Sequence, residues 1–196
     1  MEHRDYNYYE ANAATVNLGE ITSSAKNATN LQRLRDGDPK LHCLILGGRF
    51  SHFHDVSEDD DWGWLGYFIS KSENLRHLGI NYLPGGEEGH AFADIIVRNC
   101  NQSIRSINID NLNNDTFTTL IRVLRSLSIL EELSIWGENN VGPDGWSELG
   151  TLLESGVCKL KELCLCGNSY IGNEGMDVLS NGLAGIGSSF NVLRLE

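Results

Sequence analysis

The stretch Leu160–Asn168 reads LKELCLCGN, and thirty residues earlier Leu130–Glu138 reads LEELSIWGE. The similarity continues past these strand-like halves, because Leu149 corresponds to Leu179 at the same offset. A third copy, FNVLRL, occupies Phe190–Leu195. Self-similarity at a fixed period of about 20 to 50 residues is typical of a solenoid, in which each unit buries its apolar face only against its neighbours.

Six segments share the strand-like pattern, and they start at Leu41, Leu75, Ile104, Leu130, Leu160 and Phe190. A second pattern is independent of the first. An apolar residue stands seven positions before every start, namely Leu34, Phe68, Val97, Val123, Leu153 and Leu183. In a solenoid these residues form the last inward turn of the helix that precedes each strand. We therefore predict six parallel strands in sequence order, joined by helices, with these apolar side chains buried.

The best copy of the repeat runs from Leu160 to Leu183 and follows the order LxxLxLxxN, an apolar residue, Gly, and two Leu at helical spacing. This order resembles the leucine-rich repeat of the ribonuclease-inhibitor type. The resemblance implies an α/β leucine-rich-repeat solenoid, a horseshoe segment with a parallel concave sheet of about six strands and helices on its convex side. Two positions depart from the pattern, since Leu83 and Leu112 stand where the family has Asn.

The domain organisation follows the repeat boundaries. Residues 1–26 show neither helical nor strand periodicity, so we expect a flexible, loosely ordered N-terminal arm, followed by a leucine-rich-repeat domain over residues 27–196. The longest repeat carries its excess in residues 50–61, which predicts a loop on the rim of the solenoid. The last strand, at Phe190, leaves unpaired backbone groups at an edge, so we also predict self-association through that edge.

Charge narrows the choice of partner. The chain has 15 Lys and Arg against 27 Asp and Glu, a formal net charge of −12, which disfavours binding to nucleic acid. A basic protein partner is compatible with this charge, although acidity by itself also keeps an elongated surface soluble. The sequence has no run of about 18 apolar residues, so we expect no membrane span.

The chain carries no complete set of chemical groups for catalysis or metal binding. It contains no GxSxG, GxxxxGK[ST] or HExxH motif, so we expect neither an enzyme nor a cofactor. His52 and His54 precede several carboxylates, and Cys164 stands near Cys166, but neither set completes a metal site, and a solvated loop or small surface residues explain them as well. Five irregularly spaced cysteines, without a signal-peptide pattern at the N-terminus, indicate reduced thiols and a cytoplasmic location, with a nuclear one as the alternative.

The informative positions are those that strand alternation turns away from the core, onto the concave sheet. Trp136 is the residue that a core cannot account for, so we predict an interface anchor there unless a neighbouring loop covers it. Asp110 and Cys166 occupy the same position in their repeats and should form a lateral row with Trp136. The other predicted partner-binding residues are His77, Asn81, Asn108, Glu132, Ser134 and Glu162.

These expectations favour a non-catalytic protein–protein interaction module, which the family resemblance also implies. Two other classes stay open. Regulation of a small GTPase is one, since GTPase-activating proteins of the nuclear-transport type share this repeat, and stimulated GTP hydrolysis would reveal it. A metal- or redox-responsive sensor built on His52, His54 and the cysteines is the other, and stoichiometric bound metal would reveal it.

Overall fold

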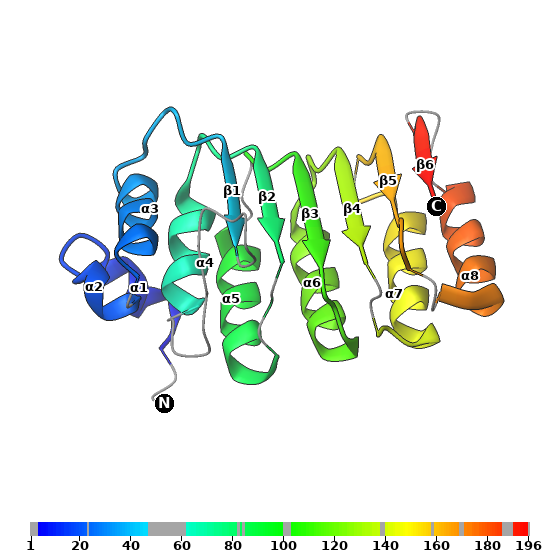
Figure 1. Ribbon diagram of the computed structural model, residues 1–196, viewed down its shortest axis with the longest axis horizontal. Helices are drawn as coiled ribbons and strands as arrows, with labels where there is room; N and C mark the ends of the chain where they lie inside the picture. The colour runs from blue at the N-terminus through cyan, green and yellow to red at the C-terminus, as the bar shows by residue number, and fades with distance from the viewer. Residues whose placement is uncertain are drawn as a thin grey trace.

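The computed structural model describes residues 4–22, 24–46, 62–81, 83, 85–99, 103–137, 140–157, 159–168, 171–185 and 190–195. Within these ranges the chain forms one sheet of six parallel strands in sequence order (Figure 1). The strands are β1 (Cys43–Leu46), β2 (His77–Ile80), β3 (Ser106–Asp110), β4 (Glu132–Trp136), β5 (Glu162–Cys164) and β6 (Val192–Arg194). The helices are α1 (Tyr6–Asn12), α2 (Leu18–Ile21), α3 (Ala25–Arg35), α4 (Trp62–Lys71), α5 (Gly86–Asn99), α6 (Asn114–Ser126), α7 (Pro143–Glu154) and α8 (Gly172–Gly185).

One helix lies between each pair of consecutive strands, and this crossover is what keeps the strands parallel. Figure 1 shows helices α4 to α8 in a row along the sheet, with the strands side by side from β1 at one end to β6 at the other. The predicted α/β solenoid with six parallel strands is therefore confirmed. Its units stack in the order of the sequence, as repeat proteins do.

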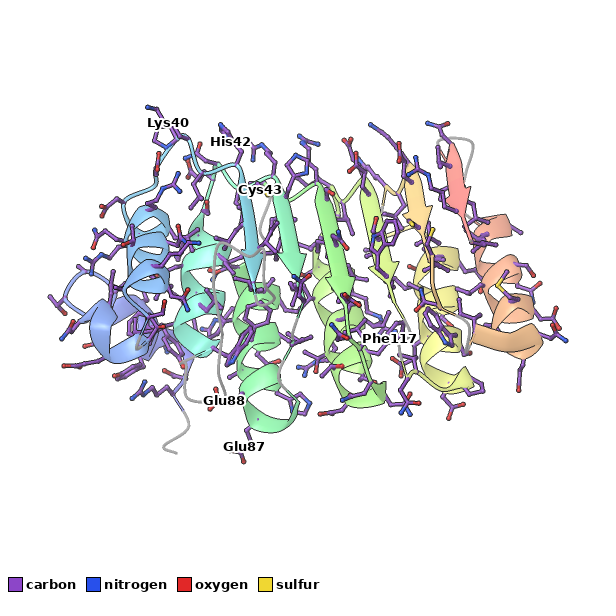
Figure 2. All side chains as sticks on the ribbon, in the orientation of Figure 1. Lys40, His42, Cys43, Glu87, Glu88 and Phe117 are labelled. Atoms are coloured by element: carbon purple, nitrogen blue, oxygen red, sulfur yellow. The ribbon has the colours of Figure 1, made fainter. Side chains whose placement is uncertain are left out.

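The core lies between the sheet and the helices. Register places one inward residue of each of the strands β1 to β5 in a continuous row, which contains Leu44, Leu78, Ile107, Leu133 and Leu163. Each of these side chains is at most 1% exposed, and burying an aliphatic side chain of this size contributes about 1.5 to 3 kcal/mol. Between helices, Phe117 of α6, labelled in Figure 2, packs on Trp146 of α7. The ring centroids lie 5.0 Å apart. The core is thus continuous from β1 to β5, whereas the equivalent residue of β6, Leu193, is 40% exposed.

The apolar position seven residues before each strand is buried in four of the six repeats, at Leu34, Phe68, Val123 and Leu153. The prediction is wrong for Val97 and Leu183, which are only half-buried. In α5 the neighbouring Ile96 is fully buried and takes the inward position instead of Val97. Leu183 lies on α8, which has a helix packed against it on one side only within the described residues.

The N-terminal segment differs from the expected loosely ordered arm, because α1 and α2 are helices with side-chain caps. Asp5 accepts a hydrogen bond from the Tyr8 amide at 3.0 Å and begins α1. Tyr9 is 3% exposed and meets the ring of Trp64 edge to face, with centroids 4.9 Å apart. The stabilising contact comes from a helix more than 50 residues away, which local periodicity cannot reveal. The division of domains at residue 26 stays a prediction.

The Asn position of the repeat has a clear structural role at Asn168. Its Nδ2 donates to the Ile135 carbonyl at 2.7 Å and to the Leu165 carbonyl at 2.8 Å, so the side chain joins neighbouring repeats. Leu83 and Leu112, which replace Asn, are buried and contribute apolar contact instead. The predicted rim loop at 50–61, with His52 and His54, lies outside the described residues.

Within the described ranges, no helix is both long and apolar enough to cross a bilayer. The edge strand β6 pairs with β5 along one side, and Leu193 and Leu195 are 40% and 44% exposed. Self-association through this edge stays a prediction.

Candidate functional site

The sheet face that points away from the core is called the open sheet face. Its outward side chains form rows across the strands, because parallel register aligns equivalent residues of each repeat. The first row contains Cys43, His77, Ser106, Glu132, Glu162 and Val192, and the second contains Ile45, Gly79, Asn108, Ser134, Cys164 and Arg194. Figure 2 draws these side chains on the ribbon and labels Cys43 on the first strand. The predicted residues His77, Asn108, Glu132, Ser134 and Glu162 are therefore brought onto one surface.

Trp136 is the aromatic residue of this face. It is the last residue of β4 and pairs in register with Asp110, as predicted. Trp136 is 42% exposed, whereas Trp62, Trp64 and Trp146 are each at most 2% exposed. The alternative in which a neighbouring loop buries Trp136 is therefore not what the described residues show.

A left-handed turn follows the strand in three consecutive repeats, and the sequence analysis did not identify it. Asn111, Gly137 and Gly167 occupy the same repeat position, and their φ angles are 58°, 86° and 76°. Glycine and asparagine tolerate this conformation better than other residues do, so the recurring Asn or Gly was the available signal. The turn directly follows β3 and β4, whereas β5 ends at Cys164, two residues before the equivalent point.

The carboxylate of Asp110 lies across the turn of the next repeat. Its Oδ1 accepts a hydrogen bond from the Asn111 amide at 2.8 Å, and a Cβ atom added to Gly137 would overlap the same oxygen. Trp136 and Asp110 thus share a compact corner in which the glycine leaves room for the carboxylate. The absence of a side chain at Gly137 is part of the geometry of the site.

Two residues of the predicted surface lie in turns rather than in strands. β5 ends at Cys164, so Cys166 follows it, and the Gly137 amide donates to the Cys166 carbonyl at 3.2 Å. In the predicted lateral row, Asp110 and Trp136 are therefore paired strand residues, and Cys166 lies in the turn that follows β5. Asn81 likewise follows β2, and its amide donates to the Leu46 carbonyl at 2.8 Å.

Cys164 was expected on the surface of the sheet but is only 6% exposed. Register does place it in the second row, between Ser134 and Arg194. The Cys166 sulfur lies 3.0 Å from the Cys164 sulfur and covers it. Burial, followed by the hydrogen bond with the Cys166 thiol, raises the pKa of Cys164.

The first row carries two neighbouring carboxylates. Glu132 and Glu162 are register partners on adjacent strands, which lie about 4.8 Å apart in a sheet. Like charges placed opposite each other on neighbouring strands repel, so this pair does not stabilise the sheet. A cationic group placed over both carboxylates would relieve the repulsion, which makes the pair suited to a basic ligand.

Beside this row, ion pairs connect the residues that precede strands β3, β4 and β5. Glu131 accepts hydrogen bonds from Arg105 Nη1 and from Lys161 Nζ, both at 2.9 Å. The Lys161 hydrogen bond, and after it the charges of Lys161 and Arg105, hold the pKa of Glu131 below its ordinary value. Glu131 is thus occupied by cations of its own chain, while Glu132 projects from the next position onto the open sheet face.

Within the described residues, no group of three or more His, Cys, Asp and Glu side chains is arranged to hold a metal ion. The surface therefore offers an aromatic side chain, carboxylates and amide or hydroxyl groups, held on a sheet of fixed register. These are groups suited to recognition of another molecule by packing and charge.

No family model matches the chain, and no curated protein matches its sequence. Among solved structures, the fold is similar to that of leiomodin-1 actin-binding site 2, with a TM-score of 0.61 and 16% identity. That match covers 83% of this chain and 90% of the other. The fold is also similar to a chain in the yeast Rad7 and Elc1 complex, with a TM-score of 0.50, 18% identity, and coverage of 97% of this chain and 44% of that one. At these identities the likeness shows the fold alone.

Proposed function

We propose that the chain is a non-catalytic protein-interaction module that binds a protein partner through the open sheet face, with Trp136 as the anchor. The observation that carries this proposal is the exposure of Trp136 on a face whose other residues are mainly small or polar. Trp136 lies on a strand with a fixed backbone, so binding would restrict few additional rotatable bonds. Tryptophan anchors of this kind dominate the energy of protein interfaces.

The exposed part of Trp136 sets the scale of its contribution. A tryptophan buries up to about 250 Å² when it is fully covered. The exposed 42% therefore corresponds to about 100 Å², and its burial at about 25 cal/mol per Å² contributes about 2.5 kcal/mol. This is the size of effect expected from a binding hot spot.

The charge of the face favours a basic partner surface. Glu132, Glu162 and Asp110 project from neighbouring strands, and the whole chain has a formal net charge of −12. Such a field accelerates the encounter with a cationic surface and contributes more to the association rate than to the final affinity.

The repeats themselves are proposed to be leucine-rich repeats of the ribonuclease-inhibitor type. This assignment is supported by the recurrence of the pattern every 26 to 34 residues, the one helix between consecutive strands and the hydrogen bonds of Asn168. The two similar structures are an actin-binding site of leiomodin-1 and a chain of the Rad7 and Elc1 complex, which supports a role in protein binding for this chain as well.

A capture experiment with matched variants tests the proposal. The immobilised chain and its Trp136→Ala variant are exposed to the same cell extract, and captured proteins are identified by mass spectrometry and then assayed in purified form. Tyr8→Ala is the control, because Tyr8 is 40% exposed on α1, a helix that packs against α4. A specific partner should bind about 2 kcal/mol more weakly to Trp136→Ala and unchanged to Tyr8→Ala.

Charge is tested by Glu132→Arg, which should slow association with that partner at low salt and have less effect at high salt. Circular dichroism confirms that each variant keeps the fold. If every captured protein binds the Trp136→Ala, Glu132→Arg double variant as tightly as the original chain, the open sheet face is not the binding surface.

A further inference from the structure

Cys164 and Cys166 are brought together by the end of β5. Residues two apart in an extended strand are separated by about 6.6 Å, so their side chains do not ordinarily touch. Here the strand ends at Cys164, and the chain turns through Gly167, whose φ is 76°. The two sulfur atoms lie 3.0 Å apart as a result. A disulfide bond is about 2.05 Å long, so a shift of about 1 Å separates this arrangement from a covalent bond.

The two thiols differ in accessibility. Cys166 is half-buried in the turn, whereas Cys164 is 6% exposed behind it. Burial raises the pKa of Cys164, while the Cys166 amide and the positive charge of Arg194, its partner in register, act in the opposite direction. An incoming reagent therefore meets Cys166 first, and Cys164 is held within reach of the sulfur that has reacted.

We propose that Cys164 and Cys166 form a thiol–disulfide exchange site whose co-reactant is a low-molecular-weight disulfide. The Cys166 thiolate attacks one sulfur of that disulfide, whose sulfur–sulfur bond breaks as the mixed disulfide forms. The first leaving thiolate takes up the proton lost by Cys166. Cys164 then attacks the Cys166 sulfur and releases the second small thiol, which takes up the proton lost by Cys164. Two protein thiols are oxidised to one disulfide, and one small disulfide is reduced to two thiols.

The product disulfide is expected to be readily reversible. It closes a loop over a single intervening residue, Leu165, and short loops gain little stability from closure. Leu165 is 2% exposed and fixed in the core, so the bond forms against a backbone that cannot adjust freely. Exposed or strained disulfides of this kind are the ones that exchange with small thiols. This inference does not rest on the proposed function, although the Cys166 carbonyl accepts the hydrogen bond from Gly137 beside Trp136.

The sequence offers a direct readout. Trypsin cleaves after Lys161 and Arg194, and the peptide 162–194 contains Cys164 and Cys166 and no other cysteine. The whole chain is equilibrated with mixtures of oxidised and reduced glutathione, quenched with an alkylating reagent and digested. The expected product is a peptide 162–194 that has lost two hydrogens and takes up no alkyl group. Cys43 is exposed in the folded chain and is the single cysteine of the peptide 41–49, so it serves as the internal control.

Variants separate the two steps. Cys164→Ser and Cys164→Ala should trap glutathione on Cys166 and give about tenfold more mixed disulfide than the original chain, because the intramolecular step that removes it is lost. Cys166→Ser should leave Cys164 mostly unreacted. Circular dichroism identifies a variant that does not fold, and two different replacements at Cys164 keep the comparison usable.

Three results would overturn the proposal. One is a peptide 162–194 that keeps two alkylated cysteines at ratios that modify Cys43. Another is equal accumulation of mixed disulfide with and without Cys164. The third is the same oxidation midpoint in the folded chain and in the chain unfolded by urea, which would mean that the fold does not organise the pair.

Discussion

Replacing Gly137 by alanine tests whether the left-handed turn after β4 is needed for the corner that holds Trp136. Gly137 has a φ of 86°, a region in which an L-residue with a Cβ atom is disfavoured by about 1 to 2 kcal/mol. The new Cβ would also overlap Oδ1 of Asp110, but a carboxylate at the end of a side chain can rotate away at low cost. The backbone term should therefore dominate, with a loss of about 1 to 2 kcal/mol of unfolding free energy.

For a chain of this length, that loss corresponds to a fall in melting temperature of about 2 to 8 °C, measured by circular dichroism or calorimetry. Matched variants separate the two causes. Gly137→Asn should lose less than Gly137→Ala, because Asn111 already adopts a φ of 58° at the equivalent repeat position. Adding Asp110→Ala to Gly137→Ala should recover little, since it removes only the overlap with the carboxylate.

An unchanged melting temperature in Gly137→Ala would refute the reasoning, because the turn would then accept any residue. Full recovery by Asp110→Ala would instead identify the overlap with the carboxylate as the cause. In both outcomes the assigned backbone origin of the effect would be wrong.

Two further predictions concern stability. Gly182→Ala should lower the free energy of unfolding by about 1 to 3 kcal/mol in a denaturant titration. The reason is that the new Cβ would overlap the Gly150 carbonyl oxygen and lie 2.8 Å from Gly150 Cα. Gly19→Ala in α2 is the control, because its Cβ would make only ordinary contact and the change should be neutral. Because the pKa of Glu131 is lowered in the folded state, its stabilising contribution is present above its ordinary pKa of 4.5 and is lost as pH falls through the lowered value. Glu131→Gln should therefore lower the urea midpoint at pH 7, and its difference from the original chain should disappear in strong acid. A difference that persists below the lowered pKa would contradict this origin.

The sheet could be predicted from the sequence because one repeated pattern indicates both the inward side chains of a strand and the residues beside them on the next strand. The LxxLxL spacing fixes which side chains point inward, and its recurrence in each repeat aligns equivalent residues of neighbouring strands. The pairing of Asp110 with Trp136 and of Glu132 with Glu162 follows from that alignment alone. Exposure of Trp136 was predicted for the same reason, since the inward positions were already occupied by Leu133 and Ile135.

Other features depend on contacts that no local pattern contains. The helix α1 is stabilised by Tyr9 against Trp64, so its order comes from a segment distant in the sequence. In α5, the rotation that buries Ile96 instead of Val97 depends on how that helix packs on its neighbours. The contact between Cys164 and Cys166 depends on the end of β5 at Cys164, whereas β3 and β4, with the same apolar spacing, continue to Asp110 and Trp136.

Trp136, Glu132 and Glu162 on the open sheet face lie outside the apolar core, and this placement supports the proposed binding role of that face. The inward rows already bury the apolar side chains that hold the repeats together. Trp136 is 42% exposed outside that core, and the adjacent carboxylates of Glu132 and Glu162 repel each other. Residues that do not favour the stability of the fold are expected at functional sites. We propose that the face around β4 is such a site, because a partner that covers Trp136 and neutralises the carboxylates would remove the exposure of the indole and the repulsion together.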